Sequence, residues 1–117
     1  MRNMLTQLPP ANGGSDVCVL IEKSDIFRYQ DGKKISDERI GVKLTVALPG
    51  SRLTPLGIKF DHDPLPEITD EEIAAATASY QFLYVQLPDC SVNLYSTSNG
   101  LGMTATAHTA HLVTLEN

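Results

Sequence analysis

The segment Thr69-Asp-Glu-Glu-Ile-Ala-Ala-Ala-Thr-Ala-Ser79 has the clearest helical pattern in the chain, and it decides the fold. Thr69 can accept a hydrogen bond from the amide of Glu72, whose carboxylate can reach back to the amide of Thr69, which makes a capping box. Asp70 and Glu71 place negative charge at the positive end of the helix dipole, and the alanines that follow favour helix. Because a helix of about three turns with a small apolar face is marginal alone in water, we expect it to lie on a sheet.

Alternating apolar residues on both sides of this helix are typical of β-strands. The clearest pattern covers residues 39–48, and we expect one face of this strand to lie in the core: Ile40, Val42, Leu44, Val46 and Leu48. The other face carries Arg39 and Lys43, which we expect to face water or a polyanion. A similar run precedes the helix, with Leu56, Ile58 and Phe60 on one face.

Two dipeptides predict hairpin turns, because Asp-Gly and Asn-Gly accept positive φ at both turn positions. They are Asp31-Gly32 and Asn99-Gly100. The last segment, residues 101–115, exchanges its apolar face near Thr109. Such an exchange predicts a bulge or bend, as a closed barrel requires.

Three strands, one short helix and then one or two hairpins predict a mostly β fold. We expect an OB-fold-like β-barrel with the short α-helix between the third and fourth strands. The alternative is an open α+β antiparallel sheet with the helix on its face. Residues 1–15 contain Pro9-Pro10 and Gly13-Gly14 and lack periodicity, so we expect a flexible N-terminal arm or an extension along a sheet edge. Residues 16–117 are expected to form a single β-rich domain.

Length and composition are those of an ordinary globular domain of 117 residues. No apolar run approaches the roughly 18 residues of a membrane span, and residues 1–10 lack the pattern of a secretory signal. We therefore expect a cytoplasmic protein with no membrane partner. Cys18 and Cys90 lie in strand-like runs without a second Cys or His at ligand spacing, so we expect both thiols to be buried and hydrophobic in character.

Charge is strongly segregated along the chain, although the net charge is −5. Residues 1–59 hold all nine Lys and Arg against six acids, for a net +3, whereas residues 60–117 hold eight acids and no base. This segregation suggests surfaces of opposite sign and an electrostatic partner. The alternative is that the basic residues scatter over solvated strand faces.

No residue pattern predicts catalysis. No serine lies in a nucleophile elbow, and Gly100-Leu101-Gly102 joins strand to strand and opens no helix that could hold a phosphate. His108 and His111 are three residues apart, which on a strand places them on opposite faces, so we do not expect a metal site with His62. We therefore expect no enzyme, no metal and no cofactor.

The remaining constellation combines basic residues with aromatic ones. Cations that follow phosphates and aromatic rings that stack on bases are how OB-folds hold single strands. The predicted nucleic-acid-binding residues are Arg28, Tyr29, Lys33, Lys34, Arg39, Lys43 and Lys59. Three further aromatic residues share one strand face, and we expect this face to belong to the core and not to a stacking surface: Tyr80, Phe82 and Tyr84.

The chain also resembles a group of small proteins encoded on conjugative elements, plasmids and phages of Gram-positive bacteria. The segments that carry the resemblance lie within residues 17–115 and are Lys43-Leu-Thr-Val-Ala-Leu-Pro, Ile68-Thr-Asp-Glu-Glu-Ile, Phe82-Leu-Tyr-Val-Gln-Leu, Val92-Asn-Leu-Tyr-Ser and Met103-Thr-Ala-Thr-Ala. Some of these proteins belong to uncharacterised domain families with OB-like barrels thought to assist single-stranded DNA handling. The resemblance implies a non-catalytic single-stranded DNA-binding accessory protein of replication or conjugative transfer. The alternative is a protein-interaction module of such a complex, which docks a partner or a second copy of itself without binding nucleic acid.

Overall fold

The structure, a computed structural model, describes the backbone of residues 3–98 and 100–113. It also describes their side chains, except those of residues 3–5, 11, 28, 29, 35–38, 97 and 101. The described residues form mostly strands: β1 (Asn3–Gln7), β2 (Val17–Gln30), β3 (Lys33–Leu48), β4 (Thr54–Phe60), β5 (Leu83–Gln86), β6 (Ser91–Thr97), β7 (Gly100–Thr106) and β8 (His111–Val113). The helical elements are short: α1 (Leu8–Ala11), the 3-10 turn η1 (Pro49–Ser51) and α2 (Asp70–Ala78).

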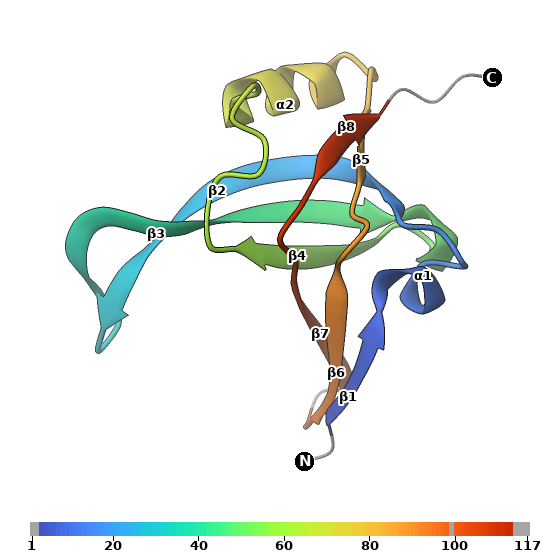
Figure 1. The fold of residues 1–117 in the computed structure, drawn as a ribbon, viewed down its shortest axis with the longest axis horizontal. Coiled ribbons are helices and arrows are strands. Elements are labelled where there is room, and N and C mark those ends of the chain that lie inside the picture. The colour runs from blue at the N-terminus through green and yellow to red at the C-terminus, as the bar shows by residue number, and fades with distance from the viewer. Residues whose placement is uncertain (1–2, 99, 114–117) are drawn as a thin grey trace.

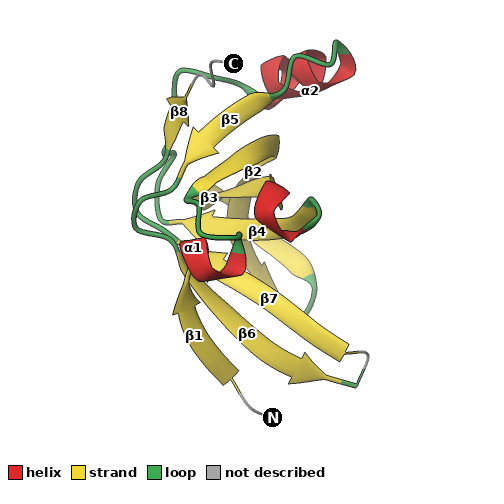
Figure 2. Cartoon of the chain, turned by 90° about the vertical axis from the view of Figure 1, so that its right-hand side faces the viewer, coloured by secondary structure: helices red, strands yellow, loops and turns green. Residues whose placement is uncertain are grey.

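The eight strands form one sheet in the order β1-β6-β7-β4-β3-β2-β5-β8. The sheet curls into a half-barrel, with β1, β6 and β7 turned away from β5 and β8 (Figure 2). Neighbouring strands are antiparallel except β4 and β7, which are parallel over Ile58↔Ala105 and Lys59↔Thr106. The prediction of a mostly β, curled sheet is therefore confirmed. The helix α2 follows β4, which is the fourth strand along the chain because β1 precedes the predicted strands.

The capping box of α2 is present as predicted. The Thr69 hydroxyl accepts a hydrogen bond from the Glu72 amide at 3.2 Å, and the Glu72 carboxylate accepts one from the Thr69 amide at 3.2 Å. The helix lies beside β2, above the sheet in Figure 1, and Ile73 is fully buried. The sheet therefore has an inner face, which carries the core beneath α2, and an outer face opposite to it.

The N-terminal segment forms an edge of the sheet. Of the two alternatives for residues 1–15, the extension along a sheet edge describes Asn3–Gln7, which pairs with β6. Leu8 is fully buried, and so is the polar side chain of Asn12, at 1% exposed. The Asn12 amide donates to the carbonyls of Ser15 and Val17 at 3.0 and 2.9 Å. Its carbonyl accepts from the Gly50 amide at 2.8 Å, which ties this segment to η1.

The predicted core alternation is confirmed along most of β3 and β4. Val42, Leu44, Val46 and Leu48 are fully buried, and Leu56, Ile58 and Phe60 are at most 3% exposed. Ile40 is the exception, since 43% of it is exposed. Ile26 pairs with Gly41 and Phe27 with Arg39, so Ile40 is an extra residue in a bulge. Because a bulge inserts one residue, the predicted alternation is wrong by one position on the N-terminal side of Gly41, that is, at Ile40 and Arg39.

The core assignment of the aromatic face after α2 is wrong. Tyr80 is 85% exposed and Phe82 is 44% exposed, while Tyr84 is half-buried on the outer face. Val85 on the opposite face is fully buried, because it pairs with the buried Cys18 of β2. Tyr80, with φ of 60°, and Phe82 precede β5, so only Tyr84 lies on the predicted strand face. Within β5 the sequence pattern separates the two faces but does not show which one faces the core.

The Asp31-Gly32 hairpin is present as predicted, since Asp31 and Gly32 have φ of 53° and 79° between the paired residues Gln30 and Lys33. The second hairpin joins β6 to β7, but Gly100 is paired with Thr97, so the turn positions are 98 and 99 and not the predicted Asn99-Gly100. Asn99 itself lies outside the described residues. The predicted bend near Thr109 is a break between β7 and β8.

At this break the Asp89 carboxylate fixes the chain. It accepts hydrogen bonds from the amides of His108 and Thr109 at 3.2 and 3.1 Å and from the Thr109 hydroxyl at 3.1 Å. Because the break redirects the chain, β7 pairs with β6 whereas β8 pairs with β5.

Asn12 provides the first test of this fold. Asn12→Ala leaves three backbone groups without their side-chain partner inside the protein, so we expect the free energy of unfolding to fall by about 2 to 4 kcal/mol. Urea denaturation measures the loss. Asn93→Ala, in a half-buried residue of β6, is the control and should cost less than about 1 kcal/mol. Equal losses in both variants would contradict this role of Asn12.

Candidate functional site

Two lysines of the predicted set lie side by side on the outer face. Lys43 of β3 is directly opposite Lys59 of β4, and both side chains are exposed. Lys43 lies across Gly57, where a Cβ atom would come within 2.6 Å of the Lys43 Cε. Neither ammonium forms an ion pair with any side chain that the structure describes. We call Lys43 and Lys59 the lysine pair.

Like charges in directly opposite positions of neighbouring strands destabilise a sheet. The lysine pair therefore carries a cost in the isolated protein that a bound anion would relieve. A phosphate group close to both ammonium groups is such an anion.

Arg39 does not join the lysine pair, although the sequence pattern placed it on the same face as Lys43. The bulge at Ile40 shifts the alternation, and the Arg39 guanidinium lies 3.5 Å from Asp25 and 3.9 Å from Asp63. Asp63 also binds Lys23, whose ammonium donates to backbone carbonyls in the connection that leads to α2. Arg39 therefore lies among carboxylates on the α2 side of the sheet.

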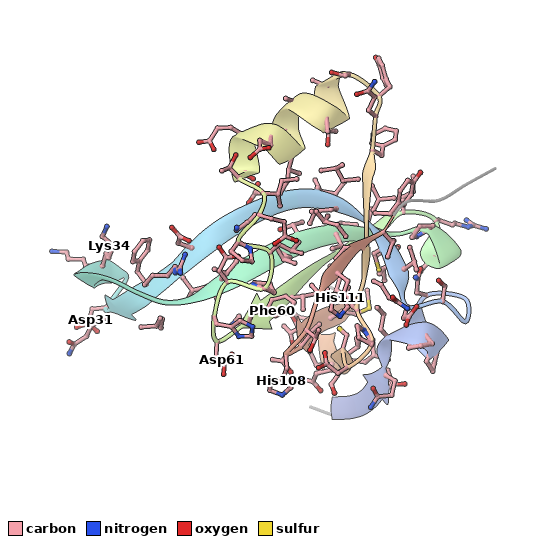
Figure 3. All side chains as sticks on the ribbon, turned by 45° about the horizontal axis from the view of Figure 1, so that its top comes forward. Asp31, Lys34, Phe60, Asp61, His108 and His111 are labelled. Carbon is pink, nitrogen blue, oxygen red and sulfur yellow. The ribbon has the colours of Figure 1, made fainter. Side chains whose placement is uncertain are left out.

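Lys33 and Lys34 lie at the end of the β2–β3 hairpin, which extends beyond the rest of the sheet (Figure 1). The Lys34 Nζ lies 4.6 Å from the centroid of the Phe27 ring, in a cation–π contact. Figure 3 shows Lys34 and Asp31 at this tip, far from Asp61 and His108. The side chains of Arg28 and Tyr29 lie outside the described residues.

An apolar groove crosses the outer face at the other end of β3. It has a volume of about 310 Å³ and is lined by Val19, Ile21, Ala47, Pro49, Leu53, Phe82 and Tyr84. Leu53 is 59% exposed and adopts a left-handed conformation, with φ of 59°. Such a conformation is rare for a bulky residue and occurs often at functional sites. Sequence reasoning missed this groove because its lining comes from three segments that are far apart in the sequence.

A second hollow, which we call the hairpin cleft, lies where the β2–β3 hairpin leaves the sheet. It has a volume of about 430 Å³ and is lined by Ile26, Ile40, Lys59, Phe60, Asp61, Thr106, Ala107 and His108. Asp61 and His108 lie near each other at the ends of β4 and β7 (Figure 3). Lys59 belongs both to this cleft and to the lysine pair, so the two features adjoin.

Asp61 is held by its neighbour His62. The Asp61 Oδ1 lies 2.7 Å from the His62 Nδ1, and the His62 ring meets the Phe60 ring edge-on at a centroid distance of 6.4 Å. The hydrogen bond with His62 is the main reason that the pKa of Asp61 is lower than usual, and a hydrogen bond from the backbone of Asp61 and the proximity of His108 lower it further. The carboxylate is therefore an ionised hydrogen-bond acceptor at neutral pH.

Cys18 and Cys90 are both free and buried, as predicted. Burial raises the pKa of Cys18 to about 12 and that of Cys90 to about 11. Thiols with such values are poor nucleophiles at neutral pH. Among the described side chains, no group of three or more His, Cys, Asp or Glu lies close enough to hold a metal ion.

Lys23 is a structural residue that the sequence pattern did not single out. Its Nζ lies 2.8 Å from the Asp63 Oδ2 and donates to the carbonyls of Leu65 and Ile68 at 2.8 and 2.9 Å. Burial raises the pKa of Asp63, but the hydrogen bonds from Lys23 and from the Leu65 amide lower it by more, and the net pKa is below its usual value. The contact fixes the chain between β4 and α2.

Comparisons with known proteins do not assign this site. No protein-family model, curated protein or solved structure matches the chain. In the part of the chain that the structure describes, none of the helices has the length and apolar character needed to cross a membrane.

The Lys23–Asp63 contact predicts a specific pH dependence of stability. As the pH falls, the unfolded chain binds a proton at this carboxyl before the folded chain does, because the folded-state pKa is lower. The stabilisation is therefore complete above about pH 4 and is lost as the pH falls through the folded-state pKa. At pH 7 we expect Asp63→Asn to lower the free energy of unfolding by about 1 to 3 kcal/mol.

Urea denaturation between neutral and acidic pH measures this effect. The wild-type and Asp63→Asn curves should converge as the pH falls below 4. Glu67→Gln removes an exposed carboxylate from the same connection and should match the wild type within about 0.5 kcal/mol at neutral pH. A constant gap between wild type and Asp63→Asn at every pH would contradict the role given to the Asp63 charge.

Proposed function

We propose that the protein binds single-stranded DNA through the outer face of its sheet, without catalysing a reaction. The lysine pair carries this proposal, since it concentrates two exposed cations that no described carboxylate neutralises. Phosphate contacts of this kind supply most of the affinity of non-specific nucleic-acid binding. The proposed role is that of an accessory protein in the replication or transfer of a mobile genetic element.

The strand pairing supports an OB-fold-like barrel. β2, β3 and β4 form a meander, and the later strands flank both of its edges, because β5 pairs with β2 and β7 pairs with β4. This is the arrangement of a partly open Greek-key barrel. If the barrel is counted from β2, with β1 left out and β5–β6 and β7–β8 each taken as one interrupted strand, α2 lies between its third and fourth strands.

The position of the lysine pair agrees with this assignment. In the OB-fold, oligonucleotides bind on the face of the second and third strands and on adjoining loops. The corresponding strands here are β3 and β4, which carry Lys43 and Lys59. The loop between the first two barrel strands is the β2–β3 hairpin, which carries Lys33 and Lys34 at its end.

Aromatic rings on the same face, of which Phe82 is exposed and Tyr84 and Tyr95 are half-buried, favour a single strand over a duplex. Phe82 and Tyr84 line the apolar groove at one end of the face. On the other side of the lysine pair, the Tyr95 ring lies over Gly102, so close that a Cβ there would overlap it. Rings in these positions can stack on unpaired bases, whereas the bases of a duplex are already stacked.

Removing the lysine pair tests the proposal. We expect Lys43→Gln/Lys59→Gln to lose roughly tenfold or more in affinity for a fluorescent single-stranded oligonucleotide at low salt, and the slope of log K against log salt to fall in magnitude by about 1.4. Fluorescence anisotropy over a range of salt concentrations measures both values. Urea denaturation should show no loss of stability, because the substitutions remove a like-charge pair.

The matched control is Arg39→Gln, which removes a cation that Asp25 and Asp63 already neutralise. We expect it to keep the wild-type affinity within about twofold and the wild-type salt slope. An affinity that depends neither on salt nor on the lysine pair would rule out the proposed function.

A protein-interaction module is the second candidate, favoured by the open edges of the sheet. β1 and β8 are the terminal strands in the sheet order, so each presents one unpaired edge among the described strands. An unpaired edge can add a strand from another chain or from a second copy. Sedimentation of the purified protein without DNA would support this function if it gave a dimer and would count against a second copy if it gave a monomer.

A further inference from the structure

The hairpin cleft is a preformed hollow directly beside the lysine pair. Its walls are mostly apolar, with Ile26 and Ile40 from the hairpin on one side and Phe60 and Ala107 on the other. Ile40 leaves 43% of its surface exposed, although isoleucine is usually buried. A flat apolar group inserted between these walls would cover this surface.

The polar groups at the cleft have a defined chemistry. Lys59 supplies a cation that is shared with the lysine pair, and Asp61 supplies a carboxylate. The Asp61 Oδ1 is bound to His62, and the backbone of Asp61 also contributes a hydrogen bond to the carboxylate. The carboxylate is fully exposed and has further lone pairs that can accept from a bound group. His108 completes the rim, and its amide is fixed by Asp89 at 3.2 Å. The cleft therefore offers the Lys59 ammonium to an anionic group. It also offers the Asp61 carboxylate, which can only accept a hydrogen bond, to a flat group that carries a donor.

We propose that the hairpin cleft binds one nucleobase of a single strand whose phosphate contacts the lysine pair, and that Asp61 accepts a hydrogen bond from an amino group of that base. This inference rests on the proposed function and adds a base preference to it. Cytosine presents an amino donor at the position where uracil presents a carbonyl acceptor. An ionised carboxylate can only accept, so it binds the cytosine amino group and repels the carbonyl that uracil has at the same position.

The test compares oligodeoxycytidine with oligodeoxyuridine of equal length at neutral pH, by anisotropy. The two bases have nearly the same size, and neither carries the methyl group of thymine. We expect wild-type protein to bind the cytosine strand about fivefold or more tightly. In Asp61→Asn this ratio should fall to about one, because an amide can accept from cytosine and donate to uracil.

Asp31→Asn is the matched control. It removes the same charge from the hairpin tip, far from the cleft, at a turn position that suits asparagine. The ratio should stay at its wild-type value in this variant. A ratio that falls equally in Asp31→Asn would reflect net charge alone and would overturn the assignment of Asp61.

Ile40→Ala tests the cleft wall separately from the phosphate contact. It should weaken binding of both strands severalfold and leave the salt slope unchanged, whereas loss of the lysine pair reduces the slope. Equal, salt-dependent binding of the cytosine and uracil strands by wild-type protein would overturn this inference and leave the proposed function standing. Failure of the wild-type protein to bind either strand would overturn both.

Discussion

The close approach of Gly41 to β4 controls how the β2–β3 hairpin leaves the sheet. A Cβ at position 41 would overlap the carbonyl oxygen of Phe60, so this position requires glycine. The next residue towards the tip, Ile40, is the bulged one, and the hairpin bends away from the sheet at this point. The bulge exposes Ile40, opens the hairpin cleft and separates Arg39 from Lys43. Most features of the outer face that concern function follow from this local geometry.

Charge in the folded protein is arranged differently from charge along the chain. The acidic second half does not form a surface separate from the basic first half, because Asp63 lies against both Lys23 and Arg39. The folded structure thus neutralises the cations on the α2 side. The lysine pair has no such carboxylate among the described residues, which makes the outer face the electrostatically distinct surface.

Local sequence patterns predicted most of the elements but little of the site. The capping box at Thr69, the Asp31-Gly32 turn and the core row of β3 depend on neighbouring residues, and each is present. The strand β1 was not predicted, because its pairing with β6 joins segments almost ninety residues apart. Lys43 and Lys59 were predicted only as two members of a larger set of basic residues. That they lie directly opposite each other depends on the register between β3 and β4, which no local sequence pattern contains.

The hairpin cleft could not be predicted for a related reason. One residue of insertion in β3 creates it, and a bulge of this kind depends on contacts with β4 that lie some twenty residues further along the chain. Alternation gave a similar ambiguity for the aromatic residues. Tyr80, Phe82 and Tyr84 alternate as core residues do, yet only Tyr84 lies in β5, and the buried residue there is Val85 on the opposite face. Alternation defines two faces, and only the packed sheet identifies the inner one.

The two buried thiols give the protein an internal reporter of its own fluctuations. Cys18 lies in β2 and Cys90 lies in the connection just before β6, so they belong to different segments of the half-barrel, and both are at most 1% exposed. A thiol reagent reaches them only when the strands that cover them separate. The rate of alkylation at native conditions would therefore record how often the half-barrel opens, without any engineered label.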